Sequence, residues 1–134
     1  MFILLWLTRN VRECEKQFRT AVFNVLTHNR DEHAKNFSFL MDEVGEWRVS
    51  PAYDLTFSSG PAGEHCTTLM GAGKNISLDH FLKLAEVAGI KKTTALQIID
   101  EVKSAVAKWP VFAKKANVKS SSFKTIQNIL KTIN

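Results

Sequence analysis

The sequence predicts a mainly α-helical domain that contains one small β-hairpin. Apolar residues recur at intervals of three and four along several stretches, which is the spacing of one buried helical face. A short segment, residues 37–41, is instead rich in aromatic residues, and a polar turn and a second short apolar segment follow it. The chain has 134 residues, of which 45% are hydrophobic and 10% aromatic, so it can form one domain with its own core.

The first seven residues, 1–7, are all apolar. They are too few to cross a bilayer, which takes about 20 residues. They lack the basic segment and the small-residue cleavage site of a signal peptide, so we do not expect one. We expect this segment either to join the core or to stay exposed as a surface that another protein covers.

A long amphipathic helix is expected from about Thr8 to His28. Its apolar stripe consists of Val11, Cys14, Phe18, Val22 and Val25. Its other faces carry the charged residues Arg9, Arg12, Glu13, Lys16 and Arg19. The helix leads the chain into a polar loop that begins at Asn29.

A hairpin is expected directly after this loop. Residues 37–41 should form its first strand, residues 42–46 its turn and residues 47–49 its second strand. Because a hairpin brings its two ends together, the loop before it and the loop after it, residues 50–56, should be neighbours.

Residues 55–74 are expected to form a glycine-rich loop. Its glycines do not form the phosphate-binding pattern GxxxxGK[ST], so they give little support to a phosphate site. Three helices are expected after it, over residues 77–88, 93–109 and 121–133. Ser77 can cap the first helix, Gly89 can end it, and Pro110 is expected to end the second. The inward stripes of the second and third helices are Leu96, Ile99, Val102 and Val106, and Phe123, Ile126, Leu130 and Ile133.

Three polar residues on the two hairpin loops have the spacing of a kinase catalytic set. Asp31 and Asn36 lie five residues apart on the first loop, and Asp54 lies on the second. Protein kinases use one Asp for the substrate hydroxyl, an Asn five residues later for magnesium, and a later Asp for magnesium. Asp31 suits the first task. Asn36 and Asp54 suit the second, because Mg²⁺ takes hard oxygen ligands and needs only one or two carboxylates besides phosphate oxygens.

Three neighbouring residues are candidates for contacts with the nucleotide. Lys35 could neutralise a phosphate during transfer, or it could be an exposed loop lysine. His33 could order the loop through a backbone hydrogen bond or touch the nucleotide. Tyr53 could pack beneath Asp54 and hold it, or it could belong to the core.

A hydrolase metal site is an alternative use of the same region. Its ligands would be His28, His33, Asp31 and Asp54. The two histidines are five residues apart, however, so they would not share one face of a helix. His65 and His80 have no partner near them in the sequence, and we expect both on the surface.

The string Asn-Arg-Asp-Glu-His-Ala-Lys-Asn at 29–36, followed by Tyr-Asp at 53–54, is more specific than the spacing alone. It resembles the catalytic region of the HipA-type serine/threonine kinases, which are the toxins of bacterial toxin–antitoxin pairs. The resemblance covers roughly residues 22–90. It continues more weakly in Asn-Ile-Ser-Leu-Asp at 75–79 and in the helix that ends at Ile90.

The resemblance implies roles for the two loops. Asp31 would be the catalytic base, and Asn36 and Asp54 would hold Mg²⁺. Residues 33–36 and 53–56 would line the ATP site, which includes His33, Lys35, Asn36, Tyr53 and Asp54.

The resemblance also implies an architecture and partners. Such kinases have a mixed N-terminal lobe and a mainly helical C-terminal lobe. We expect residues 1–134 to correspond to the C-terminal lobe, with the N-terminal lobe, which grips the ATP phosphates, absent. The family transfers phosphate from ATP to a serine of a target protein, aminoacyl-tRNA synthetases being among the targets, and a DNA-binding antitoxin restrains it. The missing lobe or a separate subunit, an antitoxin and a protein substrate are therefore the implied partners.

Charge leaves a second class of function open. Residues 91–134 carry nine lysines and two acidic residues, a net charge of +7, although the whole chain has only +5. Such a segment can face nucleic acid or an acidic partner, or be a solvated helical face. The alternative to a kinase is thus a non-catalytic module that docks an antitoxin, a separate kinase lobe or nucleic acid. Cys14 and Cys66 lack metal-site spacing and favour the reducing cytoplasm.

Overall fold

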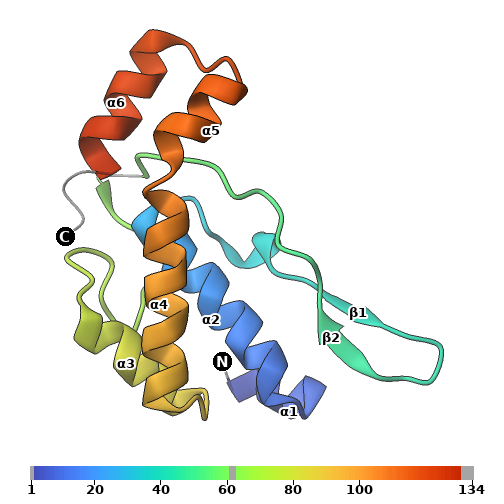
Figure 1. Cartoon of the computed structure of the whole chain (residues 1–134). Coiled ribbons are helices and arrows are strands. Elements are labelled where there is room, and N and C mark those ends of the chain that lie inside the picture. The colour runs from blue at the N-terminus through green and yellow to red at the C-terminus, as the bar shows by residue number, and fades with distance from the viewer. Residues whose placement is uncertain (1, 61–62, 131–134) are drawn as a thin grey trace.

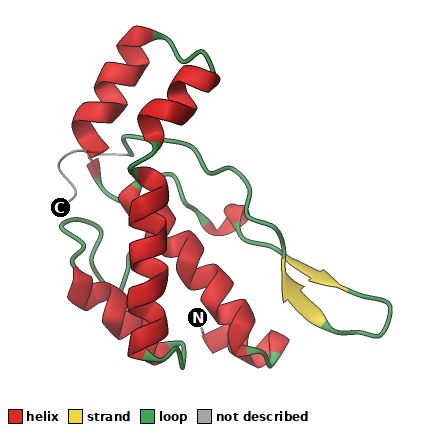
Figure 2. Ribbon diagram, in the orientation of Figure 1, coloured by secondary structure: helices red, strands yellow, loops and turns green. Residues whose placement is uncertain are grey.

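The computed structural model describes residues 2–60 and 63–130. Their helices form a body from which one two-stranded hairpin projects (Figure 1). Most of the regular structure is helical, and long loops connect the hairpin to the helices (Figure 2). The predicted class, mainly α with one small hairpin, is therefore confirmed. In chain order the elements are α1 Phe2–Thr8, α2 Val11–Leu26, the 3-10 helix η1 Ala34–Asn36, β1 Phe39–Met41, β2 Trp47–Val49, α3 Leu78–Val87, α4 Lys92–Val106, α5 Trp109–Lys115 and α6 Ser120–Leu130.

Helix α2 lies at the centre of the core. Three of its side chains, Cys14, Phe18 and Val22, are fully buried, and the helix packs against α3 and α4. Phe18 meets Phe81 of α3 edge to face, with ring centroids 6.5 Å apart. Helix α4 contributes the core residues Ala95, Ile98, Ile99 and Val102. The three-and-four spacing therefore identified the buried face of α2, although Val11, the first residue of the predicted stripe, is exposed. In α4 the predicted Ile99 and Val102 are buried, whereas the predicted Leu96 and Val106 are only half-buried.

The apolar start of the chain forms helix α1, which joins the core only in part. Leu4 is 5% exposed and belongs to the core cluster, whereas Trp6 is 78% exposed. A helix of seven residues can turn only one side toward its neighbours, which here are α2 and β2. Met1 lies outside the described residues. None of the described helices has the length and hydropathy that crossing a bilayer requires.

Helix α2 begins later than the sequence predicts, at Val11. Arg9 has a positive φ of 50° and follows the end of α1. Asn10 then caps α2, because its side-chain oxygen accepts a hydrogen bond from Arg12 N at 3.0 Å. At the other end, His28 has a φ of 51°, and the chain turns there from the helix into the polar loop.

The hairpin has the predicted order of strand, turn and strand. Its strands are antiparallel, with Leu40 opposite Arg48 at the centre. The Asp42 carboxylate closes the turn by accepting hydrogen bonds from Val44 N at 3.1 Å and Glu46 N at 2.9 Å. This turn is stabilised by contacts within five residues, which is why the sequence reveals it.

Glu13 is a correction to the predicted charged face of α2. Its side chain is buried rather than solvated. Its Oε2 accepts a hydrogen bond from Val49 N of β2 at 2.8 Å, and its Oε1 pairs with Lys16 Nζ at 2.5 Å. Because both carboxylate oxygens have donors, the charge can be buried, and the hairpin is fastened to α2.

Helix α3 has the predicted cap and stop. Ser77 N donates a hydrogen bond to His80 Nδ1 at 3.1 Å, which completes a capping box. Gly89 follows the helix with a φ of 70°. His80 is therefore partly buried and serves as a capping partner, contrary to the expectation of a histidine without partners.

Pro110 does not end α4, so that prediction is wrong. Helix α4 ends at Val106, and Pro110 lies in the first turn of α5. Proline has no N–H and a fixed φ suited to a first turn, so it starts a helix as readily as it stops one. Helix α5 pairs with α6, where the rings of Trp109 and Phe123 stack with centroids 6.3 Å apart. Ile133, predicted at the end of the last helix, lies outside the described residues.

Candidate functional site

Two loops meet at the base of the hairpin (Figure 1). They carry the predicted site residues, and hydrogen bonds hold them together. Ser58 N, on the loop after the hairpin, donates to His28 O at 3.0 Å at the start of the loop before it. The Tyr53 hydroxyl donates to Lys35 O at 2.6 Å. The two loops are therefore neighbours, as the hairpin predicted.

The buried side chain of Asn29 forms a hydrogen bond to the second loop, a role that the sequence did not suggest. It is 2% exposed, and its Nδ2 donates to Asp54 O and to Asn24 Oδ1, each at 3.2 Å. Asn24 is itself buried in α2. Asn29 opens the specific string at 29–36, but nothing in a pattern distinguishes a buried asparagine from an exposed one.

The first loop turns around Asp31. Its backbone oxygen accepts hydrogen bonds from His33 N at 2.9 Å and from Asn36 Nδ2 at 3.2 Å. Asn36 N in turn donates to His33 O at 2.9 Å. Within the described residues, the Asn36 side-chain oxygen and the Asp31 carboxylate have no hydrogen-bond partner. Asp31, His33 and Lys35 are all exposed. The loop is thus ordered through its backbone, and the side-chain oxygens of Asp31 and Asn36 remain free of hydrogen bonds within the described residues.

Asp54 has a left-handed backbone, with a φ of 54°. Aspartate is one of the few residue types that tolerate this conformation, which often occurs at functional sites. Its side chain is exposed and accepts no hydrogen bond from the described part of the chain. Tyr53 beside it is 41% exposed, so it does not belong to the core.

The site residues border only a small hollow. Asn36 and Tyr53 line it together with Ser38, Ser50 and side chains of α2, and its volume is about 20 Å³. Neither Asp31 nor Asp54 is part of this lining. The two loops therefore offer an open face rather than an enclosed nucleotide pocket.

The alternative of a histidine-based hydrolase centre gains no support from the described residues. Among them, no group of three or more His, Cys, Asp or Glu side chains is placed to hold a metal ion. Burial, followed by the nearby Arg30 and His65, lowers the pKa of His28 below its ordinary value. His28 is therefore a neutral, half-buried side chain at the end of α2.

His65 is not on the surface, so that expectation is wrong. It is 9% exposed, and its Nδ1 lies 2.6 Å from Glu32 Oε1, which is also buried. The partner is 33 residues away along the chain. No local pattern could reveal such a pair.

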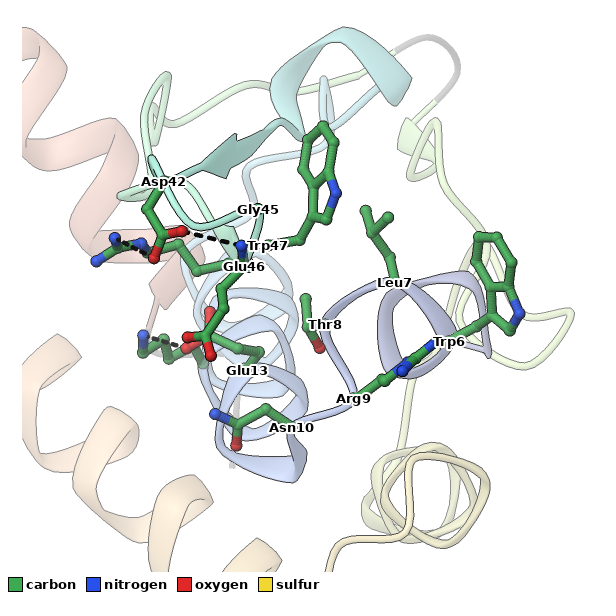
Figure 3. Close-up of a pocket in the computed structure, with 12 residues that line it drawn as sticks. Trp6, Leu7, Thr8, Arg9, Asn10, Glu13, Asp42, Gly45, Glu46 and Trp47 are labelled. Atoms are coloured by element: carbon green, nitrogen blue, oxygen red, sulfur yellow. Dashed lines mark hydrogen bonds and ion pairs between the residues drawn. The ribbon is translucent and has the colours of Figure 1, made fainter.

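A larger cleft, of about 870 Å³, lies between α1, the start of α2 and the turn of the hairpin (Figure 3). Trp6 and Trp47 stand on its walls, and Glu13 lies at its side (Figure 3). It contains none of the residues that the sequence predicted for the site. This cleft and the two loops are thus separate surfaces.

Comparison with known proteins agrees with the motif on the two loops. The sequence matches the family described as HipA-like C-terminal domain over residues 2–109. A protein of Sinorhizobium fredii (strain NBRC 101917 / NGR234), named "Putative kinase Y4mE", is 29% identical over 102 residues, a match that covers 69% of this chain and 24% of the relative. The chain thus spans about a quarter of that relative's length. Since the family match takes in α1 to α4, the hairpin and both loops, the chain belongs to the family of HipA-like C-terminal domains.

Proposed function

We propose that the chain is the catalytic-loop lobe of a serine/threonine kinase that transfers phosphate from Mg²⁺-ATP to a serine of another protein. The observation that carries this proposal is the hydrogen-bonded pair of loops at the base of the hairpin, because Asp31 and Asn36 lie on one of these loops and Asp54 lies on the other. The name of the Sinorhizobium relative adds support for a kinase.

The available oxygen atoms fit the metal that this chemistry requires. Asp54 supplies a carboxylate, and Asn36 supplies a neutral amide oxygen that adds no negative charge next to ATP. Bound Mg²⁺ would neutralise charge on the phosphates during transfer. Asp31, whose carboxylate is exposed, would orient the serine hydroxyl and accept its proton. His33, Lys35 and Tyr53 would border the nucleotide.

The proposed kinase needs parts beyond these loops. The described hollow at the site is far smaller than a nucleotide, so groups that grip the β- and γ-phosphates would come from another lobe or subunit. In keeping with the family, a DNA-binding antitoxin would restrain the kinase in the cytoplasm of a bacterium. Its substrate would be a protein serine, as in an aminoacyl-tRNA synthetase.

Titration of the chain with Mg²⁺-ATP, monitored by amide chemical shifts, tests the proposal, because this method detects even weak binding. The largest shifts should fall in residues 31–36 and 53–56. Asp54→Asn should abolish their dependence on Mg²⁺, whereas Asp31→Asn should leave it unchanged, because Asp31 addresses the hydroxyl. Asp79→Asn, an exposed position on α3, is the matched control and should change nothing. Shifts that avoid both loops would refute the assignment.

The rate of phosphate transfer tests the proposed role of Asp31. The chain alone should transfer little phosphate, because misplacement of a group by 1 Å can cost about 10²-fold in rate. In the protein completed by its other lobe, Asp31→Asn should reduce the rate by about 10²–10⁴-fold, as expected for loss of a general base. Rapid transfer by the 134-residue chain on its own would contradict the proposed division of parts.

A binding module is the second candidate, and the α5–α6 pair favours it. Most of this pair lies beyond the family match, which ends at residue 109. Its lysines are exposed, no acidic residue follows Glu101 in the sequence, and none of these lysines forms an ion pair within the described residues. The lysines in question are Lys108, Lys114, Lys115, Lys119 and Lys124.

Nucleic acid is the partner that this lysine pattern fits, because phosphates can be contacted without base recognition. Binding of duplex DNA at low salt, measured by fluorescence anisotropy, should weaken as salt rises. Lys114→Glu with Lys115→Glu should reduce both the affinity and the salt slope. Lys83→Glu, an exposed lysine on α3, is the control. No binding at low salt would leave the lysines as a solvated face.

A further inference from the structure

A second segment of chain, residues 65–67, forms hydrogen bonds to the loop that carries Asp31, and we call it the clamp. His65 Nδ1 lies 2.6 Å from Glu32 Oε1, and both side chains are buried, at 9% and 6% exposed. The neighbours of His65 also contact this loop: Cys66 N donates to Arg30 O at 3.0 Å, and the Thr67 hydroxyl donates to Glu32 O. Three consecutive residues therefore hold the residues on either side of Asp31.

Asp31 is the residue that this clamp leaves out. Arg30 and Glu32 are fastened by their backbone oxygens, and Glu32 also by its side chain. Asp31, between them, is exposed, and within the described residues it forms no hydrogen bond with residues 65–67. Its backbone oxygen is used instead within its own loop, where it accepts from His33 N and Asn36 Nδ2. The clamp thus fixes the backbone around Asp31 while its carboxylate faces solvent.

The clamp is built around the buried carboxyl group of Glu32, which lies in a loop outside the apolar core. Burying a carboxylate is costly unless a donor satisfies it. In the described part of the chain, Glu32 Oε2 has no partner, so His65 supplies the donor that makes burial of this side chain tolerable. The N–H group that His65 can present at Nδ1 is a donor for this oxygen. Loss of His65 would leave the Glu32 carboxyl group without its hydrogen-bond partner, and this side chain would then move toward water.

Two further hydrogen bonds hold the segment that contains the clamp. His65 N donates to Gly73 O at 3.0 Å. Arg30 Nη1 reaches back to Ser59 O at 3.2 Å. Together with the contacts of residues 65–67, these hydrogen bonds make the described residues 59–60 and 63–73 a brace across the first loop.

We propose that His65 is a positioning residue: through Glu32 it holds the loop in the conformation that presents the Asp31 carboxylate. The proposal rests on the proposed function for the role of Asp31. The clamp itself does not depend on that role, so the two can be tested apart.

Hydrogen exchange of the His33 amide is the direct readout, because this amide donates to Asp31 O. His65→Leu should accelerate its exchange by about ten- to a hundredfold, the effect of losing a buried hydrogen bond to a charged group. His65→Asn should restore slow exchange, since its side-chain amide can place a donor near the position of Nδ1. Amides of Val22 and Ile99, in the core, should exchange at wild-type rates in both variants.

The outcomes are distinct. Unchanged exchange at His33 in His65→Leu would overturn the proposal, and so would equal acceleration at His33 and Val22, which would mean global destabilisation. Failure of His65→Asn to restore protection would also overturn it. A wild-type chain that shows no Mg²⁺-ATP shifts would instead count against the proposed function and leave the clamp standing.

His80→Leu is the matched control variant. His80 also pairs with a neighbouring side chain, but it does so at the cap of α3, away from the clamp. Its replacement should leave exchange of the His33 amide unchanged. Acceleration at His33 as large as in His65→Leu would show that the effect does not pass through Glu32, and the proposal would fail.

Discussion

Glu13 shows how much a single buried side chain decides in this molecule. It is the contact through which β2 hydrogen-bonds to α2, by way of Val49 N. Burial by itself raises the pKa of Glu13, but the hydrogen bonds from Lys16 and from Val49 N and the charge of Arg48 lower it by more. The pKa of the folded state therefore lies below the ordinary value, and folding favours the ionised carboxylate.

Glu13→Gln should lower the free energy of unfolding at pH 7 by about 1–3 kcal/mol, because hydrogen bonds to a charged group are lost. A depressed folded pKa contributes stability above the unfolded pKa, which is about 4.3, and loses it as the pH falls through the folded pKa. The difference between wild type and variant should thus shrink from pH 7 toward pH 3 in urea titrations.

Glu15→Gln is the control for this prediction. Glu15 is the next glutamate on α2, and it forms no hydrogen bond within the described residues. Its replacement should change the free energy of unfolding by no more than about 0.5 kcal/mol. A loss in Glu13→Gln that stays the same at every pH would rule out an ionic contribution.

At the scale of elements, the described loop residues 59–60 and 63–73 include one glycine, Gly60, that cannot be replaced without movement of its neighbours. Gly60 has a φ of 66°, and a Cβ there would lie 2.4 Å from Glu64 O and 2.7 Å from Arg30 Cβ. Gly71, in the same loop, has a φ of 86° but open space around it. Both need the left-handed conformation, and only Gly60 is also held by contact with the first loop.

Gly71→Ala should therefore cost only the conformational strain, about 1–2 kcal/mol. Gly60→Ala should lower the free energy of unfolding by about a further 1–3 kcal/mol, because the added Cβ overpacks the site. It should also speed hydrogen exchange of the His33 amide. Urea denaturation and hydrogen exchange measure the two effects. Equal behaviour of the two variants would mean that the loop yields freely at Gly60.

At the scale of the whole molecule, apolar side chains remain exposed on α1 and on the hairpin. Leu5 and Trp6 are exposed on the first, and the second adds Leu40, Met41, Val44 and Trp47. Leu4, on α1, is instead part of the core. Single exposed apolar residues are common, but several of them on two adjacent elements favour association with another protein surface. The contact between α1 and β2 makes them neighbours.

Leu4→Ala should destabilise the fold by about 2–5 kcal/mol, as for a buried leucine, without changing the association state. Trp6→Glu should leave stability nearly unchanged and reduce any self-association of the chain. Light scattering and urea denaturation of the two variants separate these effects. If Trp6→Glu lost as much stability as Leu4→Ala, Trp6 would have to be a core residue.

Local signals in the sequence determined most of the elements. The three-and-four spacing identified the buried face of α2 and part of that of α4, namely Ile99 and Val102, and Ser77 and Gly89 marked the ends of α3. The string at residues 29–36 indicates the family without any information on tertiary contacts, and the family match agrees with it. Such features are readable because they depend on backbone preferences and contacts within a few residues.

The tertiary structure alone decided which polar residues are buried and where loops meet. Glu13 and Val49 are 36 residues apart in the chain, and Glu32 and His65 are 33 apart. The position of Pro110 in the first turn of α5, where its neighbour Trp109 stacks on Phe123 of α6, is also visible only in the tertiary structure. A buried carboxylate is tolerated only where a distant donor reaches it, and no local pattern records that distance. The sequence therefore determined the elements and the motif, whereas long-range hydrogen bonds decided how the site is held.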